Sequence, residues 1–320
     1  MNASIGQPFD SLAGSRTVAC VDIGGTKVAV TLASQRGFAT RFSEPTANTG
    51  GNDALAVQVL RMIEGACQEA DVSPDRLDAV GVASAGPFVR RDGLIELASP
   101  NLCGGLAGPA RGLPNDWRTA VLERPLRQHY RDVRVANDCV AALIAERRWG
   151  ALQGIDHCAY VTWSTGIGAG LCVDGRVLGG RNGNAGHAGH SFVNDDASPC
   201  GCGNLGDVEA QVAGSAIERR FGVDAATLMA AARAGEERAV QRVDDACRVL
   251  GRALYNLVVT LDLQCVSVGG AVFWHHRDVL LPKLRAQVEG RLRAITDGAT
   301  LVPAGLGMQV GDYGALALVA

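Results

Sequence analysis

Short apolar runs and longer stretches with helical spacing alternate along the chain. An apolar run at 18–21 precedes a glycine turn at 22–27, and a second apolar run follows at 28–32. The same order of run, turn and run recurs over 158–173. Short apolar runs bounded by glycine are typical of buried strands. The pattern therefore predicts two related halves, each with a strand, a glycine turn and a returning strand.

Between and after these runs, apolar residues recur at helical spacing. They predict one helix over 55–66 and a long amphipathic helix over 240–261. Further strands are predicted at 79–83, at 134–137 and at 265–268, directly after the long helix. Strands that alternate with helices predict an α/β fold with layered sheets.

Bulk composition narrows the class of protein. The chain has 320 residues, which favours two domains, and its 47% hydrophobic and 20% charged residues are typical of a globular protein. A net charge of −3 gives no support for a nucleic-acid surface, and no apolar run reaches the length of a membrane span. Residues 1–16 lack the apolar region of a secretion signal and are predicted to form a flexible extension. We expect a cytoplasmic protein without a nucleic-acid or membrane partner.

The segment 187–209 concentrates side chains that bind metals. Most of the ten cysteines stand singly in apolar runs, as small buried hydrophobes do. Two of them instead stand among glycines near histidine, and imidazole and thiolate are the usual ligands of zinc. By itself the segment is equally typical of a zinc knuckle in an unrelated protein. The side chains concerned are His187, His190, Cys200, Cys202, Asp207 and Glu209.

Two glycine-rich turns carry groups suited to phosphate. The first contains Asp22, Gly24, Gly25, Thr26 and Lys27, and the second contains Thr165, Gly166 and Gly168. Glycine lets backbone N–H groups approach a phosphate closely, and Asp22 offers a carboxylate on the magnesium side. Each turn alone is more simply an ordinary hairpin turn. Because both follow apolar strands, together they favour a nucleotide held between two domains, with Gly269 and Gly270 predicted to lie against its adenosine.

Asp138 follows Asn137 at the carboxyl end of a predicted strand. Ligands of α/β proteins bind at this end of the strands. A carboxylate there can accept a hydroxyl proton during phosphoryl transfer. An Asp before a helix is equally typical of an N-cap. The residue alone leaves both roles open.

In this order, the motifs resemble those of the ROK family of sugar kinases and repressors. The motifs are Asp22–Lys27, Asn137–Asp138, Ser164–Gly170, Ala185–His190 and Cys200–Gly203, and the resemblance extends from Thr17 onward. It implies the two-domain, actin-like (hexokinase/ribonuclease H-like) α/β fold, with the active site in the interdomain cleft. We expect a small domain over 17–136, completed by a segment at roughly 300–320, and a large domain over 137–299.

The resemblance implies a sugar kinase that depends on ATP and magnesium, with Asp138 as the general base. Asn101, Asn137, His190 and Glu209 match sugar-binding positions of the family. His187 stands where glucose-type members usually carry Glu, and here the chain resembles the subgroup that phosphorylates the 6-hydroxyl of N-acetylmannosamine. An imidazole can donate to an N-acetyl carbonyl, which a carboxylate cannot. The alternatives are that His187 is a tolerated neighbour and that the substrate is glucose, fructose or N-acetylglucosamine.

Asp207 departs from the family's zinc motif, which usually has a third cysteine at this position. Zinc accepts carboxylate oxygen, so we expect a site made by His190, Cys200, Cys202 and Asp207. Oxygen is a harder ligand than sulfur, so the affinity is expected to be lower. Loss of zinc with retention of the loop is the competing interpretation.

Two other classes of function explain the motifs less well. A zinc-bound structural module does not explain the glycine turns. A non-catalytic, sugar-sensing regulator would not need Asp138, and the family's repressors carry an N-terminal DNA-binding domain that residues 1–16 are too few to form. We also expect a homodimer with sugar and ATP as small-molecule partners.

Overall fold

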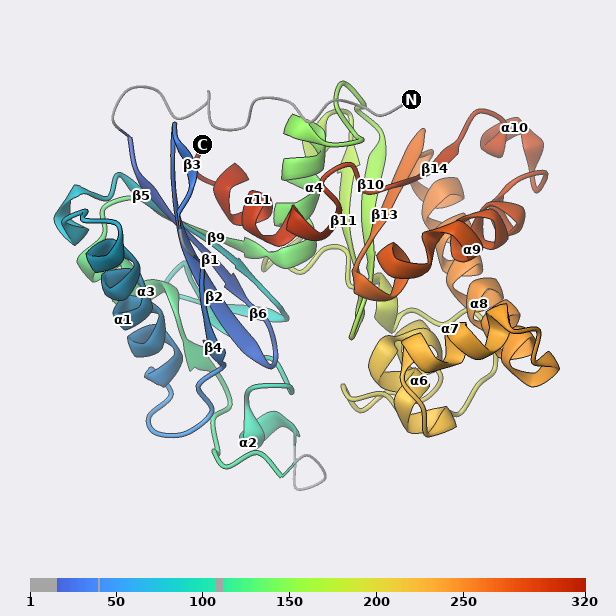
Figure 1. The fold of residues 1–320 in the computed structure, drawn as a ribbon, viewed down its shortest axis with the longest axis horizontal. Helices are drawn as coiled ribbons and strands as arrows, with labels where there is room; N and C mark the ends of the chain where they lie inside the picture. Colours follow the sequence, from blue (N-terminus) through green and yellow to red (C-terminus); the bar gives the residue numbers. More distant parts are fainter. Residues whose placement is uncertain (1–15, 40, 108–111) are drawn as a thin grey trace. The chain divides into compact units, whose positions relative to one another are not determined.

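The computed structural model describes residues 16–39, 41–107 and 112–320, and its helices and strands are labelled in Figure 1. The chain divides into two compact units. Unit 1 consists of Gly150–Leu178 and Ala185–Met308, and unit 2 consists of the described part of Ser4–Trp149 with Gly179–Asn184 and Gln309–Ala320. The extension predicted over 1–16 lies outside the described residues except for Arg16.

Unit 2 is built on a six-stranded mixed sheet with the order β3-β2-β1-β5-β9, in which β4 also pairs with β2. Its strands are β1 (Val18–Ile23), β2 (Lys27–Ser34), β3 (Gly37–Phe38), β4 (Phe42–Pro45), β5 (Ala79–Ser84) and β9 (Val133–Asn137). Strands β1, β5 and β9 are parallel, and their last residues, Ile23, Ser84 and Asn137, lie in register. The first glycine turn and Asn137 therefore lie at the same edge of one sheet.

Helices cover this sheet. A small second sheet is formed by strands that lie between β5 and β9 in the chain. The helices of unit 2 are α1 (Ala54–Glu69), α2 (Gly104–Ala107), α3 (Glu123–His129), α4 (Asp138–Trp149) and α11 (Val310–Ala317). The second sheet contains β6 (Phe88–Arg91), β7 (Leu94–Leu97) and β8 (Ala120–Val121). Helix α1 buries the apolar residues that predicted it, among them Leu55, Val59 and Ile63. Helix α11 contacts α4, β1 and β5.

Unit 1 contains a five-stranded sheet with the order β12-β11-β10-β13-β14. Its strands are β10 (Cys158–Trp163), β11 (Ile167–Val173), β12 (Arg176–Val177), β13 (Cys265–Gly269) and β14 (Thr300–Pro303). Strand β10 pairs antiparallel with β11 and parallel with β13, as β1 does with β2 and β5. The two related halves that the sequence predicts are therefore present.

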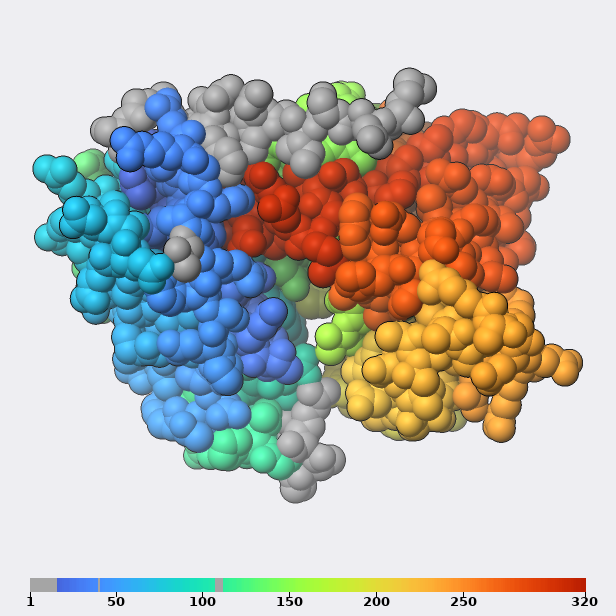
Figure 2. All heavy atoms as spheres, in the orientation of Figure 1, coloured from blue at the N-terminus to red at the C-terminus, as the bar shows by residue number. Residues whose placement is uncertain are grey.

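The helices of unit 1 pack on one another and on this sheet. They are α5 (Val208–Val212), α6 (Gly214–Phe221), α7 (Ala225–Arg233), α8 (Glu237–Leu261), α9 (Ala271–Val288) and α10 (Arg293–Thr296). The long helix predicted over 240–261 is α8, and it contacts α5, α7, α9 and α10. Helices α6 and α7, gold in Figure 2, lie at the surface in that view.

The break between the units lies after Trp149, so α4 and its first residue, Asp138, belong to unit 2. Strand β14, in the segment expected to complete the small domain, instead pairs with β13 of unit 1. Domain boundaries at residues 136 and 299 stay a prediction. In the described ranges, no helix is long and apolar enough to cross a membrane.

Candidate functional site

The first glycine turn joins β1 to β2 in unit 2. The N–H of Gly24 donates to the carbonyl oxygen of Lys27 at 2.9 Å, which closes the turn. Thr46 holds it from outside, because its hydroxyl donates to the Gly24 carbonyl at 3.0 Å and its N–H donates to the Thr26 carbonyl at 3.1 Å. Sequence analysis missed Thr46, since a single threonine after a strand belongs to no recognisable motif.

Gly25 of the same turn lies against Asn101. A Cβ atom placed on Gly25 would be 3.2 Å from the Cβ atom of Asn101, closer than most real contacts of this kind. Glycine therefore leaves room for the asparagine beside the turn. The N–H of Asn101 donates to the hydroxyl of Ser99 at 3.3 Å. The structure thus places one expected sugar-binding residue next to the expected phosphate turn.

Asp22, on β1, lies among other charged side chains of unit 2. Arg41 places Nη2 3.4 Å from Oδ2 of Asp22 and Nε 2.8 Å from Oδ1 of Asp312. Burial, together with the charges of Asp138 and Asp312, raises the pKa of Asp22 to about 6, while Arg41 and Lys27 act in the opposite direction. A magnesium ion beside Asp22 would favour the ionised carboxylate as Arg41 does.

Asp138 is the first residue of α4, directly after β9. Its Oδ1 accepts the N–H of Cys139 at 2.8 Å, and Oδ1 of Asn137 accepts the same N–H at 3.0 Å. Burial raises the pKa of Asp138, and the hydrogen bond from Cys139 opposes that shift. This N–H belongs to the next residue, whereas an N-cap accepts from a residue two or three further on, so the bond is local to Asp138 and the capping role stays a prediction. The bond engages one carboxylate oxygen, so it is compatible with a role for the carboxylate as a base.

The second glycine turn joins β10 to β11 in unit 1. The hydroxyl of Ser215 donates to the Thr165 carbonyl at 2.8 Å. Oε2 of Glu209 accepts the N–H of Ile167 at 2.9 Å, and a Cβ atom on Gly166 would be 2.7 Å from this oxygen. Glu209, which the resemblance assigns to the sugar, therefore also holds the second turn in place.

Three further glycines of the expected nucleotide site lie in the sheet of unit 1 or at its edge. Gly168 is the second residue of β11. A Cβ atom on Gly269 would be 2.6 Å from the hydroxyl oxygen of Tyr160, and one on Gly270, whose φ is +88°, would be 2.5 Å from the Trp163 carbonyl oxygen. Packing against β10 therefore suffices to explain glycine at 269 and 270, and their contact with adenosine stays a prediction.

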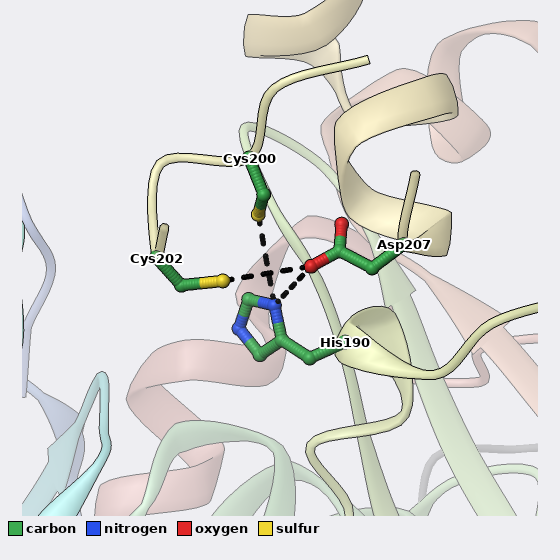
Figure 3. A group of neighbouring side chains, drawn as sticks. All are labelled: His190, Cys200, Cys202 and Asp207. Carbon is green, nitrogen blue, oxygen red and sulfur yellow. Dashed lines mark hydrogen bonds and ion pairs between the residues drawn. The ribbon is translucent and has the colours of Figure 1, made fainter. Parts of the chain in front are cut away.

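Four side chains of the segment 187–209 converge on one point in unit 1, as Figure 3 shows for His190, Cys200, Cys202 and Asp207. One ligand atom from each lies within 4.8 Å of the others. Nδ1 of His190 is 3.0 Å from Oδ2 of Asp207 and 3.7 Å from Sγ of Cys200, and Sγ of Cys202 is 3.5 Å from Oδ2 of Asp207. Ligand atoms around tetrahedral zinc lie about 3.3–3.8 Å apart. The three contacts lie near this range and the whole set spreads to no more than 4.8 Å, so small side-chain shifts would let the four residues hold a zinc ion.

The carboxylate of Asp207 also suits a cation. Burial alone raises the pKa of Asp207, but hydrogen bonds from His190, the Ala210 N–H and Cys200 outweigh it and bring the pKa to about 2. The hydrogen bond to Asp207 raises the pKa of His190, and burial raises that of Cys200. The cluster thus combines a buried carboxylate with imidazole and thiol, the donor types that zinc takes when the ligands lose their protons.

His187 lies beside the cluster with its ring stacked on that of His190, at a centroid distance of 6.0 Å and an interplanar angle of 22°. Burial and the neighbouring His190 lower the pKa of His187, which favours the neutral ring. Its Nε2 atom is buried and has no hydrogen-bond partner among the described residues. Buried polar atoms are usually paired, so this nitrogen is available to a ligand group or a water molecule.

Taken together, the two units define an α/β protein with a glycine turn in each half, a strand-end carboxylate and a potential zinc cluster. The sequence model of the ROK family matches residues 18–320. The N-acetylmannosamine kinase of Shigella flexneri is 34% identical over 264 residues, which are 80% of this chain and 83% of that protein. The chain therefore belongs to the ROK family.

Solved structures agree with this assignment. The ROK hexokinase of Thermus thermophilus is 32% identical, with a TM-score of 0.74 over 94% of this chain and 97% of its own. The ROK family glucokinase of Streptomyces griseus, solved with glucose and AMPPNP, is 26% identical, with a TM-score of 0.72 over 94% and 98% of the two chains. The actin-like α/β fold implied by the sequence motifs is confirmed.

Proposed function

We propose that this chain, a sugar kinase of the ROK family, transfers the γ-phosphoryl group of ATP to the 6-hydroxyl of N-acetylmannosamine. The observation that carries the choice of sugar is the neutral ring of His187 with its buried, unpartnered Nε2. A neutral imidazole can present N–H at Nε2, and the carbonyl oxygen of an N-acetyl group can accept it. A carboxylate at this position could only accept from hydroxyls.

The free-energy cost of leaving Nε2 of His187 without a partner favours the acetylated sugar. A buried donor or acceptor left without a partner costs about 1–3 kcal/mol. An N-acetyl carbonyl that pairs with Nε2 removes that cost, whereas a sugar without the acetyl group leaves it in place. The likeness to N-acetylmannosamine kinases supports the same choice.

In the proposed reaction, Asp138 accepts the proton of the 6-hydroxyl as the oxygen attacks the γ-phosphorus and ADP leaves. The hydrogen bond from Cys139 fixes one carboxylate oxygen of this base. Magnesium, when bound, neutralises charge on the phosphates. We assign the phosphates to Asp22, Gly24, Gly25, Thr26, Lys27, Thr165, Gly166 and Gly168, the adenosine to Gly269 and Gly270, and the sugar to Asn101, Asn137, His187, His190 and Glu209.

We also propose that zinc is bound by His190, Cys200, Cys202 and Asp207, which suit it in chemistry and would reach it after small side-chain shifts. The metal would fix the loop that carries His187 and Glu209. Because Nδ1 of His190 belongs to the cluster, its other ring nitrogen is the one we assign to the sugar. A cytoplasmic location and a homodimer are further proposals.

The sugar is tested by an assay of ATP consumption over hexoses and N-acetylhexosamines. N-acetylmannosamine should give the highest kcat/KM, and His187→Glu should shift the preference toward sugars without the acetyl group. The exposed His129→Glu variant controls for the charge change. A tenfold preference for glucose, about 1.4 kcal/mol in transition-state binding, would contradict the proposed sugar. An unchanged preference in His187→Glu would assign no role to His187.

A further inference from the structure

The two carboxylate oxygens of Asp207 face different parts of unit 1. Oδ2 lies in the cluster, 3.0 Å from Nδ1 of His190. Oδ1 accepts the N–H of Ala210 at 2.8 Å, and Asp207 is the N-cap of α5. The side chain is fully buried. A thiolate at this position would have a single sulfur for both contacts, so the aspartate offers what a cysteine cannot.

Helix α5 carries Glu209 in its first turn. Oε2 of Glu209 accepts the N–H of Ile167 and lies against Gly166, in the turn between β10 and β11. A continuous series of contacts therefore leads from the cluster through the Asp207 cap and the first turn of α5 to the second glycine turn. An N-cap satisfies an otherwise unpaired N–H at the start of a helix and so fixes where that helix begins.

We propose that Asp207 is a positioning residue that couples metal binding to the second glycine turn, with Oδ2 bound to the metal while Oδ1 caps α5 and keeps Glu209 against Gly166 and Ile167. The coupling rests on the proposed zinc site and not on the identity of the sugar. Because the two contacts use different oxygens, a substitution can remove one contact and leave the other.

Three variants separate the two contacts. Asp207→Cys keeps a metal ligand but removes the capping oxygen, Asp207→Ser keeps a capping oxygen but removes the carboxylate, and Asp207→Ala removes both. Asp224 provides a matched control, because it caps α7 through the same kind of bond, from the N–H of Thr227 at 2.7 Å. It is not a member of the metal-binding cluster.

Two measurements are made on each full-length protein after equilibration with zinc, without sugar or nucleotide. Elemental analysis gives the zinc content, and hydrogen exchange followed by NMR or mass spectrometry gives the protection of the Ala210 and Ile167 amides. The wild type should hold about one zinc per chain. Asp207→Cys should retain zinc while both amides exchange roughly fivefold faster.

Asp207→Ser should lose zinc affinity yet keep most of the protection at Ala210, and Asp207→Ala should lose both. Asp224→Ala should speed exchange in α7 alone and leave the zinc content unchanged. Unchanged exchange in Asp207→Cys, or full zinc affinity in Asp207→Ser, would overturn the coupling. A wild type without zinc would also overturn it, and the sugar assay would still decide the proposed kinase reaction independently.

Discussion

Asp138 is the residue on which the proposed chemistry depends, and its surroundings suit a base. It stands where β9 ends and α4 begins, and the N–H of Cys139 holds one of its oxygens. Burial raises its pKa, so the ionised form needed for catalysis is lost at a higher pH than for an ordinary aspartate. We therefore expect kcat/KM to fall as the pH decreases through this raised value.

Replacement of Asp138 by Asn should separate catalysis from binding. The amide oxygen of Asn can still accept the Cys139 N–H, but the side chain can no longer take a proton. We expect kcat to fall about 10²–10⁴-fold, with sugar affinity, measured by calorimetry, largely kept. Asp132→Asn, at a carboxylate paired with Arg134 just before β9, serves as the control. Near wild-type turnover by Asp138→Asn would exclude Asp138 as the base.

A site residue can be predicted from the sequence when the signal for it lies close by in the chain. Asp138 stands directly after an apolar run, so its place at a strand end could be inferred. Arg41 and Asp312 could not be found in this way, because they meet Asp22 only when segments far apart in the chain fold together. The unpartnered nitrogen of His187 is likewise a property of packing and not of the sequence pattern.

At the scale of elements, the first glycine turn is held by a contact from outside it. The hydroxyl of Thr46 donates to the Gly24 carbonyl at 3.0 Å. Thr46→Val keeps the branched shape and removes this bond, so the turn, to which we assign the phosphates, should hold them less well. A hydrogen bond is worth about 0.5–1.5 kcal/mol, which corresponds to an increase of roughly 2–10-fold in the KM for ATP.

The KM for the sugar should change less in Thr46→Val than the KM for ATP. Thr31→Val is the matched control, because the hydroxyl of Thr31 also donates to a backbone carbonyl, that of Ala39, at 3.0 Å. Steady-state kinetics with each substrate varied in turn measures both constants. An equal rise in the ATP constant for the two variants would mean that the effect is general destabilisation.

Individual strands and helices are easier to predict from the sequence than the way they pack together. The apolar period of α1 and α8 and the run–turn–run pattern of both hairpins are local signals. The short helix α5 has no such period, and its start depends on a cap that the sequence analysis read as a metal ligand. The packing of α11 also depends on residues far away in the sequence. Ala315 of this helix lies against Gly81 of β5, where a Cβ atom would be 2.1 Å from the Ala315 carbonyl oxygen.

At the scale of the whole molecule, Asp22 makes the free energy of unfolding depend on pH. Its pKa in the folded protein is about 6, against an ordinary value of 3.8. A raised pKa means that the folded state favours the protonated form, so this contribution to stability is complete below 3.8 and is lost as the pH rises through about 6. At pH 7 the ionised Asp22 therefore lowers the free energy of unfolding.

Asp22→Asn should accordingly be more stable than the wild type at pH 7.5 and similar to it at pH 4, even though it loses the proposed magnesium contact. One pKa unit corresponds to about 1.4 kcal/mol, which sets an upper limit of about 3 kcal/mol. The gain should be smaller, since the side chain is 30% exposed and paired with Arg41. Chemical unfolding at both pH values tests this, with exposed Asp75→Asn as the control for lost charge. Equal stabilities of Asp22→Asn and wild type at pH 7.5 would refute it.

The return of α11 to unit 2 has a consequence for protein synthesis. A ribosome makes β1, β5 and α4 early, but the helix that contacts all three is made only after the whole of unit 1 has been translated. Until then Arg41 lacks its partner Asp312, and the charged surroundings of Asp22 are incomplete. Domains generally fold as units while the chain emerges, N-terminal first, but here unit 2 must wait for its last helix. A chain cut short before Asp312 would therefore lack most of α11 and the partner of Arg41 beside Asp22, however well unit 1 had folded.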